Sequence, residues 1–126
     1  MKRHPTLVPL ARDHHSALVF ARWAAQFPAD ECWPADSETA TRIAQARSHL
    51  LQHFLEEEAL LCPRLEALGM TGALQRLHTE HAALRALLDQ ADHAEPLHAL
   101  GQLLSAHTRW EDRDLFPALE LRWDAA

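Results

Sequence analysis

The sequence predicts an all-α protein made of four helices that form two similar helix hairpins. The chain of 126 residues has only three Gly and no Tyr, and it is rich in Ala, Leu, Glu and Arg, which are strong helix formers. Proline and glycine interrupt it near 28–34, at 69–72 and at 95–96, and the segments between these breaks have helical periodicity. At this length, one domain spanning residues 1–126 is expected.

The first two helices are expected at about residues 10–26 and 37–61. The first has a modest apolar stripe, which leaves its register open. The second has a clear stripe at three- and four-residue spacing, which predicts that its members face the core. The two stripes are Leu10, His14, Leu18 and Ala21, and then Ile43, Ala46, Leu50, His53, Glu57 and Leu60.

The third and fourth helices are expected at about residues 73–91 and from Pro96 onward. Proline suits the first turn of a helix because its nitrogen needs no hydrogen-bond acceptor there. Each helix carries polar residues within its apolar stripe. The stripes are Leu74, Leu77, His81, Leu84 and Leu88, and then Leu97, Leu100, Leu104, His107, Glu111 and Leu115.

An internal repeat relates the two hairpins. The segments HFLEEEALLCPRLE (53–66) and HTRWEDRDLFPALE (107–120) share His, Glu, Leu, Pro, Leu and Glu at equivalent positions. Each follows a helix that bears an inward histidine. The repeat predicts a pseudo-twofold axis between the hairpins, with Pro63 and Pro117 ending or kinking their helices beyond the site.

The repeated His-x-x-x-Glu motif predicts a site for two metal ions. Residues four apart share one face of a helix, so His53 with Glu57, and His107 with Glu111, can each chelate one ion. Imidazole and carboxylate ligands suit iron or manganese, with zinc as an alternative. A carboxylate from each half can bridge the ions. Without metal, the same residues could satisfy one another as buried ion pairs.

Further ligands are expected from the first and third helices. His81 lies on the apolar stripe of the third helix. His78, three residues earlier, is left open as either an extra ligand or a supporting or surface residue, and it is not included in the predicted ligand set. On the first helix either His14 or His15 is expected to bind, with a slight preference for His14 because apolar residues follow it at inward positions. The predicted metal ligands are therefore His14, His15, His53, Glu57, His81, His107 and Glu111, with no catalytic residue assigned.

Composition excludes several classes of partner. A formal net charge of -6 without clustered Lys or Arg argues against nucleic acid. No apolar run is long enough for a bilayer, and no secretory signal is recognisable, so a cytoplasmic location is expected. Cys32 and Cys62 have no CxxC spacing, which argues against a thiolate zinc site. Oligomeric state is not indicated.

The motifs resemble the bacterial hemerythrin-like HHE cation-binding domains. RDHHSAL, HFLEEEALLCPRLE, TEHAAL and HTRWEDRDLFPALE carry this resemblance along nearly the whole chain. It implies an up-down-up-down bundle holding two non-haem iron ions, with Glu57 and Glu111 as bridging carboxylates. Invertebrate oxygen carriers instead use HxxxxD on the fourth helix, and Asp112 has that spacing from His107. Glu111 is preferred because it matches the first copy of the motif.

Three kinds of function fit these expectations. The first is a binding or sensing protein for O₂ or NO, or one that handles iron, and it is preferred over catalysis. The second is a di-iron enzyme that reduces peroxide, NO or O₂, although no proton donor is evident. The third is a metal-free or zinc-bound helical interaction module.

Overall fold

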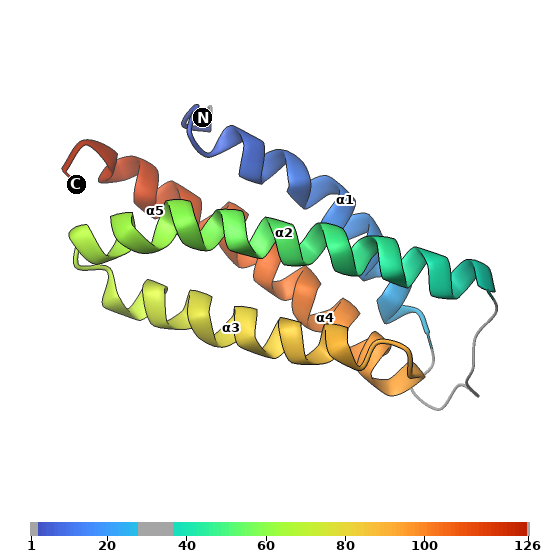
Figure 1. Cartoon of the computed structure of the whole chain (residues 1–126). Coiled ribbons are helices and arrows are strands. Elements are labelled where there is room, and N and C mark those ends of the chain that lie inside the picture. The colour runs from blue at the N-terminus through green and yellow to red at the C-terminus, as the bar shows by residue number, and fades with distance from the viewer. Residues whose placement is uncertain (1–2, 28–36, 126) are drawn as a thin grey trace.

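A computed structural model describes residues 3–27 and 37–125 and confirms an all-α four-helix bundle. The helices run alternately up and down, so α1 begins and α5 finishes at the same end of the bundle (Figure 1). No strand occurs within the described ranges. The elements are α1 Val8–Ala25, α2 Ser37–Ala67, α3 Thr71–Asp89, α4 Ala94–Trp110, the π-helical η1 Glu111–Leu115, α5 Phe116–Leu121 and the 3₁₀ turn η2 Trp123–Ala125.

Helices α1 and α4 pack closely because a glycine removes the side chain between them. A Cβ atom added at Gly101 would lie 2.4 Å from the backbone nitrogen of Ala25 and 2.6 Å from the carbonyl oxygen of Ala21. Both distances are too short for any side chain. Gly101 therefore sets how near the first helix comes to the fourth.

A glycine also ends α2. Gly69 has φ of +69°, which an L side chain rarely adopts. The N–H of Met70 donates to the carbonyl of Leu65 at 2.9 Å, and the N–H of Gly69 donates to that of Glu66 at 3.0 Å. These bonds satisfy carbonyl groups that the helix end leaves free. The helix passes the expected end at Leu61 and continues through Pro63 to Ala67.

The fourth helix changes pitch near Pro117. It leaves the α form after Trp110, makes the π-helical turn η1, and resumes as α5. The N–H of Phe116 donates to the carbonyl of Glu111, five residues back. Proline has no N–H and its ring would crowd the carbonyl of Arg113 in an ordinary α-helix, and a wider turn relieves that crowding.

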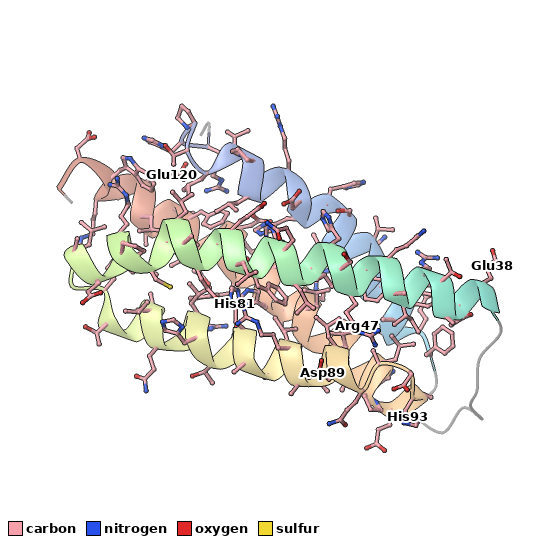
Figure 2. The ribbon with its side chains drawn as sticks, viewed as in Figure 1. Glu38, Arg47, His81, Asp89, His93 and Glu120 are labelled. Carbon is pink, nitrogen blue, oxygen red and sulfur yellow. The ribbon has the colours of Figure 1, made fainter. Side chains whose placement is uncertain are left out.

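The core consists of two apolar clusters with a polar layer between them. One cluster includes Ala17, Phe54, Leu84 and Leu104, and the other includes Leu10, Leu61, Leu77 and Leu115. On every helix, the predicted inward polar residues lie in sequence between members of the two clusters. His81 lies about midway along the bundle, whereas Glu38 and His93 lie towards one end and Glu120 towards the other (Figure 2).

Candidate metal centre

Six polar side chains from all four helices are buried in the layer between the apolar clusters. Their exposed fractions do not exceed 4%, which is unusual for histidine and glutamate outside a paired or ligand-binding site. They are His14, His53, Glu57, His81, His107 and Glu111.

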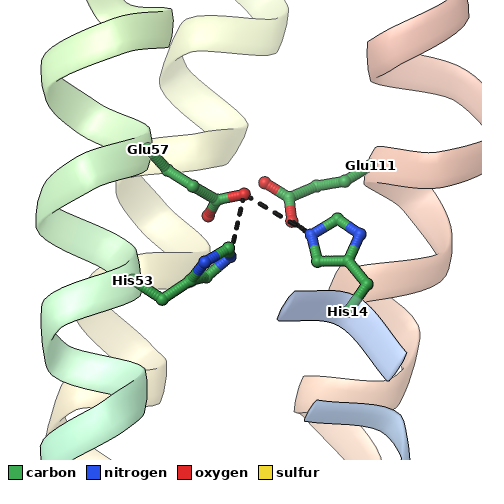
Figure 3. A group of neighbouring side chains, drawn as sticks. All are labelled: His14, His53, Glu57 and Glu111. Atoms are coloured by element: carbon green, nitrogen blue, oxygen red, sulfur yellow. Dashed lines mark ion pairs between the residues drawn. The ribbon is translucent and has the colours of Figure 1, made fainter. Parts of the chain in front are cut away.

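Two glutamates occupy the middle of the layer. Glu57 Oε2 lies 3.3 Å from His53 Nε2 and 3.6 Å from His14 Nε2, and its other oxygen, Oε1, lies 3.0 Å from His81 Nε2. Glu111 Oε1 lies 3.0 Å from His14 Nε2 and 3.4 Å from His107 Nε2. Figure 3 shows His14 and His53 pointing towards the carboxylates of Glu57 and Glu111. Each glutamate thus faces histidines from both hairpins.

Four carboxylates surround this inner cluster, and each contacts one histidine at Nδ1, the ring nitrogen that faces away from the centre. In every case the carboxylate comes from one helix and the histidine from the next, so the contacts form a closed ring around the bundle. The pairs are Asp13 with His53 Nδ1 at 2.9 Å, Glu58 with His81 Nδ1 at 2.6 Å, Glu80 with His107 Nδ1 at 2.7 Å, and Asp112 with His14 Nδ1 at 2.7 Å.

These outer carboxylates determine which ring nitrogen faces inward. An ionised carboxylate only accepts hydrogen bonds, so each histidine must donate its Nδ1–H outward. In the neutral ring, Nε2 then carries a lone pair directed at the centre of the bundle. The same arrangement orients histidine ligands in known metal sites.

Without metal, contacts within the cluster shift the pKa values of its histidines. Burial disfavours the charged ring of His14, but the carboxylates of Asp112, Glu111 and Glu57 outweigh it and raise its pKa to about 11. Burial is likewise outweighed at His107, where Glu111 and Glu80 raise the pKa to about 9. Both rings are therefore protonated on both nitrogens, and so positively charged, at neutral pH when no metal is bound.

The two central glutamates differ in acidity. Burial opposes ionisation of Glu57, yet contacts with His14, His53 and His81 lower its pKa well below the usual value. Burial and the negative charge of Glu57 raise the pKa of Glu111. Two carboxylates this close repel each other unless positive charge lies between them.

The donor atoms fit a pair of metal ions. Four of the buried polar atoms make no hydrogen bond to any residue that the structure describes, namely His14 Nε2, Glu57 Oε2, His107 Nε2 and Glu111 Oε2. All but Glu111 Oε2 make only ion-pair contacts of 3.0–3.6 Å within the cluster. Buried polar atoms without hydrogen bonds are costly, and a cation would satisfy all four. The ligand atoms form two groups, each with atoms within 4.8 Å of one another. Position A comprises His14, His53, Glu57 and Glu111, and position B comprises Glu57, His81, His107 and Glu111.

The structure separates the two candidates on the first helix. His14 is buried within position A, whereas His15 is exposed and lines a surface pocket of about 550 Å³ between α1 and α2. They differ because neighbouring residues on a helix point about 100° apart. His15 is thus not brought to the cluster.

The other histidine left open, His78, also lies away from the inner cluster. It is exposed, and its Nε2 lies 3.8 Å from the sulfur of Cys62. Asp112, the alternative to Glu111, contacts the outer nitrogen of His14 rather than facing the interior.

Sequence reasoning missed the roles of Asp13 and Glu80. For Glu58 and Asp112, which directly follow the motif glutamates and so point away from them, it predicts either a supporting position behind the ligands or a position at the surface. A signal was present. Asp13 and Glu80 each precede an inward histidine, while Glu58 and Asp112 each follow an inward glutamate. The carboxylates therefore repeat with the hairpins.

No helix in the described ranges is both long and apolar enough to cross a membrane. Comparisons with curated proteins and with solved structures gave no significant match. The family model of the hemerythrin HHE cation-binding domain matches residues 10–119, which is most of the chain and includes every residue of the buried cluster. This chain therefore belongs to the hemerythrin HHE cation-binding domain family.

Proposed function

We propose that the protein binds two iron ions in the buried layer and uses them to bind or sense O₂ or NO, or to handle iron. The observation that carries this proposal is the set of four buried polar atoms without a hydrogen-bond partner among the described residues. His14 and His53 would hold one ion, His81 and His107 the other, and Glu57 and Glu111 would bridge them. Manganese or zinc would be the competing occupants.

The donor types favour iron or manganese. Each position offers two imidazoles and two carboxylates, a mixed nitrogen and oxygen set that suits iron and manganese. Neither position includes a thiolate. Two imidazoles and two shared carboxylates would be fewer ligands than iron usually takes, which would leave room for a small molecule to bind.

A reduced iron pair can bind a diatomic molecule such as O₂ or NO. In this protein, buried apolar side chains enclose the residues that would hold the iron. The ring of His14 stacks on that of Phe116 with centroids 5.5 Å apart, and His81 packs on Phe54 at 4.6 Å. Both phenylalanines are at most 1% exposed. Apolar walls of this kind exclude water and slow side reactions.

Ligand binding is preferred over reductive catalysis because the Nδ1 protons of the histidines are already hydrogen-bonded to the outer carboxylates. Each of the four inner histidines directs Nδ1 at an outer carboxylate and Nε2 at the interior. With metal bound at Nε2, no histidine in this cluster has a free proton for a bound substrate.

Metal analysis of variants tests the dinuclear site. We expect about two iron ions per chain in protein loaded anaerobically with Fe(II). The double variant Glu57→Gln, Glu111→Gln should bind much less, because it removes both bridging charges. Glu56→Gln is the matched control, since Glu56 is exposed on the same helix. A folded wild-type protein that binds less than one equivalent would overturn the proposal, and two equivalents of zinc in preference to iron would favour the interaction module.

Rapid mixing of the reduced, iron-loaded protein with O₂ separates binding from catalysis. A long-lived absorption band that disappears when O₂ is removed is the expected result. Continuous consumption of O₂ and reductant over many turnovers would instead assign the protein to the enzymes.

A further inference from the structure

We infer that the two metal positions are unequal, and that position A takes the first ion more tightly than position B because arginines neutralise the carboxylates behind B alone. This inference rests on the proposed dinuclear site. It concerns the residues surrounding the cluster, which break the symmetry that the repeat gives to its centre.

Both outer carboxylates behind position B have an arginine partner. Arg85 donates to both oxygens of Glu58 at 2.7 and 2.9 Å, a two-point contact. Arg76 donates to Glu80 Oε2 at 2.9 Å. Each of these glutamates also accepts the Nδ1–H of a position B histidine. Each glutamate and its arginine together carry no net charge.

The carboxylates behind position A lack such partners. Within the described residues, no arginine or lysine forms an ion pair with Asp13 or with Asp112. Arg3 reaches only the backbone carbonyl of Asp112, at 3.1 Å, and forms its ion pair with Glu120 instead. Besides His53, Asp13 has an ionisable neighbour in His49, which lies 4.0 Å away and is about half exposed. Position A therefore has two negative charges behind its histidines, where position B has two neutral pairs.

This difference acts on a bound cation in two ways that agree. Uncompensated carboxylates attract a dication more strongly than neutral pairs do. They also accept the Nδ1 proton more fully, which makes Nε2 a stronger donor to the metal. The arginines do help to fix Glu58 and Glu80 in place. That benefit is smaller, because the contacts with His81 and His107 already orient those carboxylates.

Stepwise titration with cobalt(II), followed by its visible absorption in competition with a chelator, tests the inference. We expect two steps whose dissociation constants differ by about 10-fold to 100-fold, the usual size of effects from groups that support metal ligands. His53→Ala should remove the tight step and keep the weak one. His81→Ala should do the reverse.

Arginine variants test the cause. The double variant Arg76→Gln, Arg85→Gln should lower the dissociation constant of the weak step and so bring the two dissociation constants closer together. Circular dichroism verifies that the variant is folded. Arg22→Gln is the matched control, because Arg22 is exposed on α1 and outside the ring. His49→Gln should leave the tight step in place.

Three results would overturn the inference. They are two equal steps, loss of the tight step in His81→Ala, and a weaker second step in the arginine variant. In each case the protein without substitutions still binds two ions, so the proposed function stands. A folded protein that binds neither cobalt nor iron would overturn the proposed function as well, and stoichiometry distinguishes that outcome.

Discussion

The protonation of individual histidines in the buried cluster makes the stability of the protein depend on pH. The pKa of His107 rises from 6.5 to about 9 in the folded, metal-free protein, because Glu111 and Glu80 outweigh the effect of burial. A histidine whose pKa is higher in the folded than in the unfolded state stabilises the folded state at pH values below its unfolded pKa. That contribution is lost as the pH rises through the folded value.

We therefore expect the metal-free protein to lose stability between about pH 7 and pH 10. The shift at His107 from 6.5 to about 9 corresponds to roughly 3 kcal/mol of unfolding free energy. Urea unfolding across this range should show the decline, and His107→Gln should reduce it. His93→Gln, in an exposed residue, should retain it. Constant stability from pH 7 to pH 10 would contradict this account.

Metal binding should release protons from the same residues. His14 and His107, with pKa values of about 11 and 9, are both protonated at pH 7.5, and a metal ion must displace the proton on Nε2. We expect at least two protons to be released per metal pair, since burial is also outweighed at His53, where Glu57 and Asp13 raise the pKa. Calorimetry in buffers of different ionisation enthalpy measures this number directly. Binding enthalpies that are independent of the buffer would show that the rings were already neutral.

Contacts between helices fix where the histidines meet. Because α1 and α4 approach at Gly101, the axial position of His14 relative to Glu111 depends on a residue several turns from the site. A methyl group at Gly101 would meet backbone atoms of α1, which cannot rotate away as a side chain can. The two helices would have to separate.

Gly101→Ala should destabilise the protein by about 1–3 kcal/mol, the usual cost of overpacking. Gly72→Ala provides the matched control, since nothing lies within 4 Å of a Cβ added there. That change should be neutral or slightly stabilising, because alanine favours the helix. Chemical unfolding of both variants gives the comparison. Equal stability in the two would rule out a close contact at Gly101.

At the scale of the whole molecule, the bundle contains a charged layer between two apolar clusters. Glu57 and Glu111 are each at most 1% exposed, and burial of charge is costly unless it is compensated. The histidines compensate part of that cost in the metal-free state. Bound cations would compensate it more fully.

Metal loading should therefore raise the unfolding temperature. A free metal concentration about 1,000 times the dissociation constant adds about 4 kcal/mol, which corresponds to a rise of roughly 10–20 °C for a domain of this size. Differential scanning calorimetry with and without Fe(II) measures the change. The Glu57→Gln, Glu111→Gln variant should show little response. An equal rise in that variant would point to binding elsewhere on the protein.

Local patterns in the sequence were enough to predict the helices and most residues of the buried polar layer. Apolar residues at helical spacing place His53, Glu57, His107 and Glu111 on inward faces, and this depends only on local geometry. The repeat of two hairpins was visible for the same reason. Helix ends were predicted less well at Pro63, because packing along α2 overrides the local preference of proline to break a helix.

How the helices face one another could not be predicted from single helices. Packing of the bundle places His14 rather than His15 in the cluster and links Asp13 to His53 and Glu80 to His107 across neighbouring helices. Among the described residues, it also puts arginines behind position B and none behind position A. These features depend on the rotation and axial offset of each helix relative to its neighbours. Periodicity within one helix carries no information about either quantity, so it could not establish which carboxylate contacts which histidine.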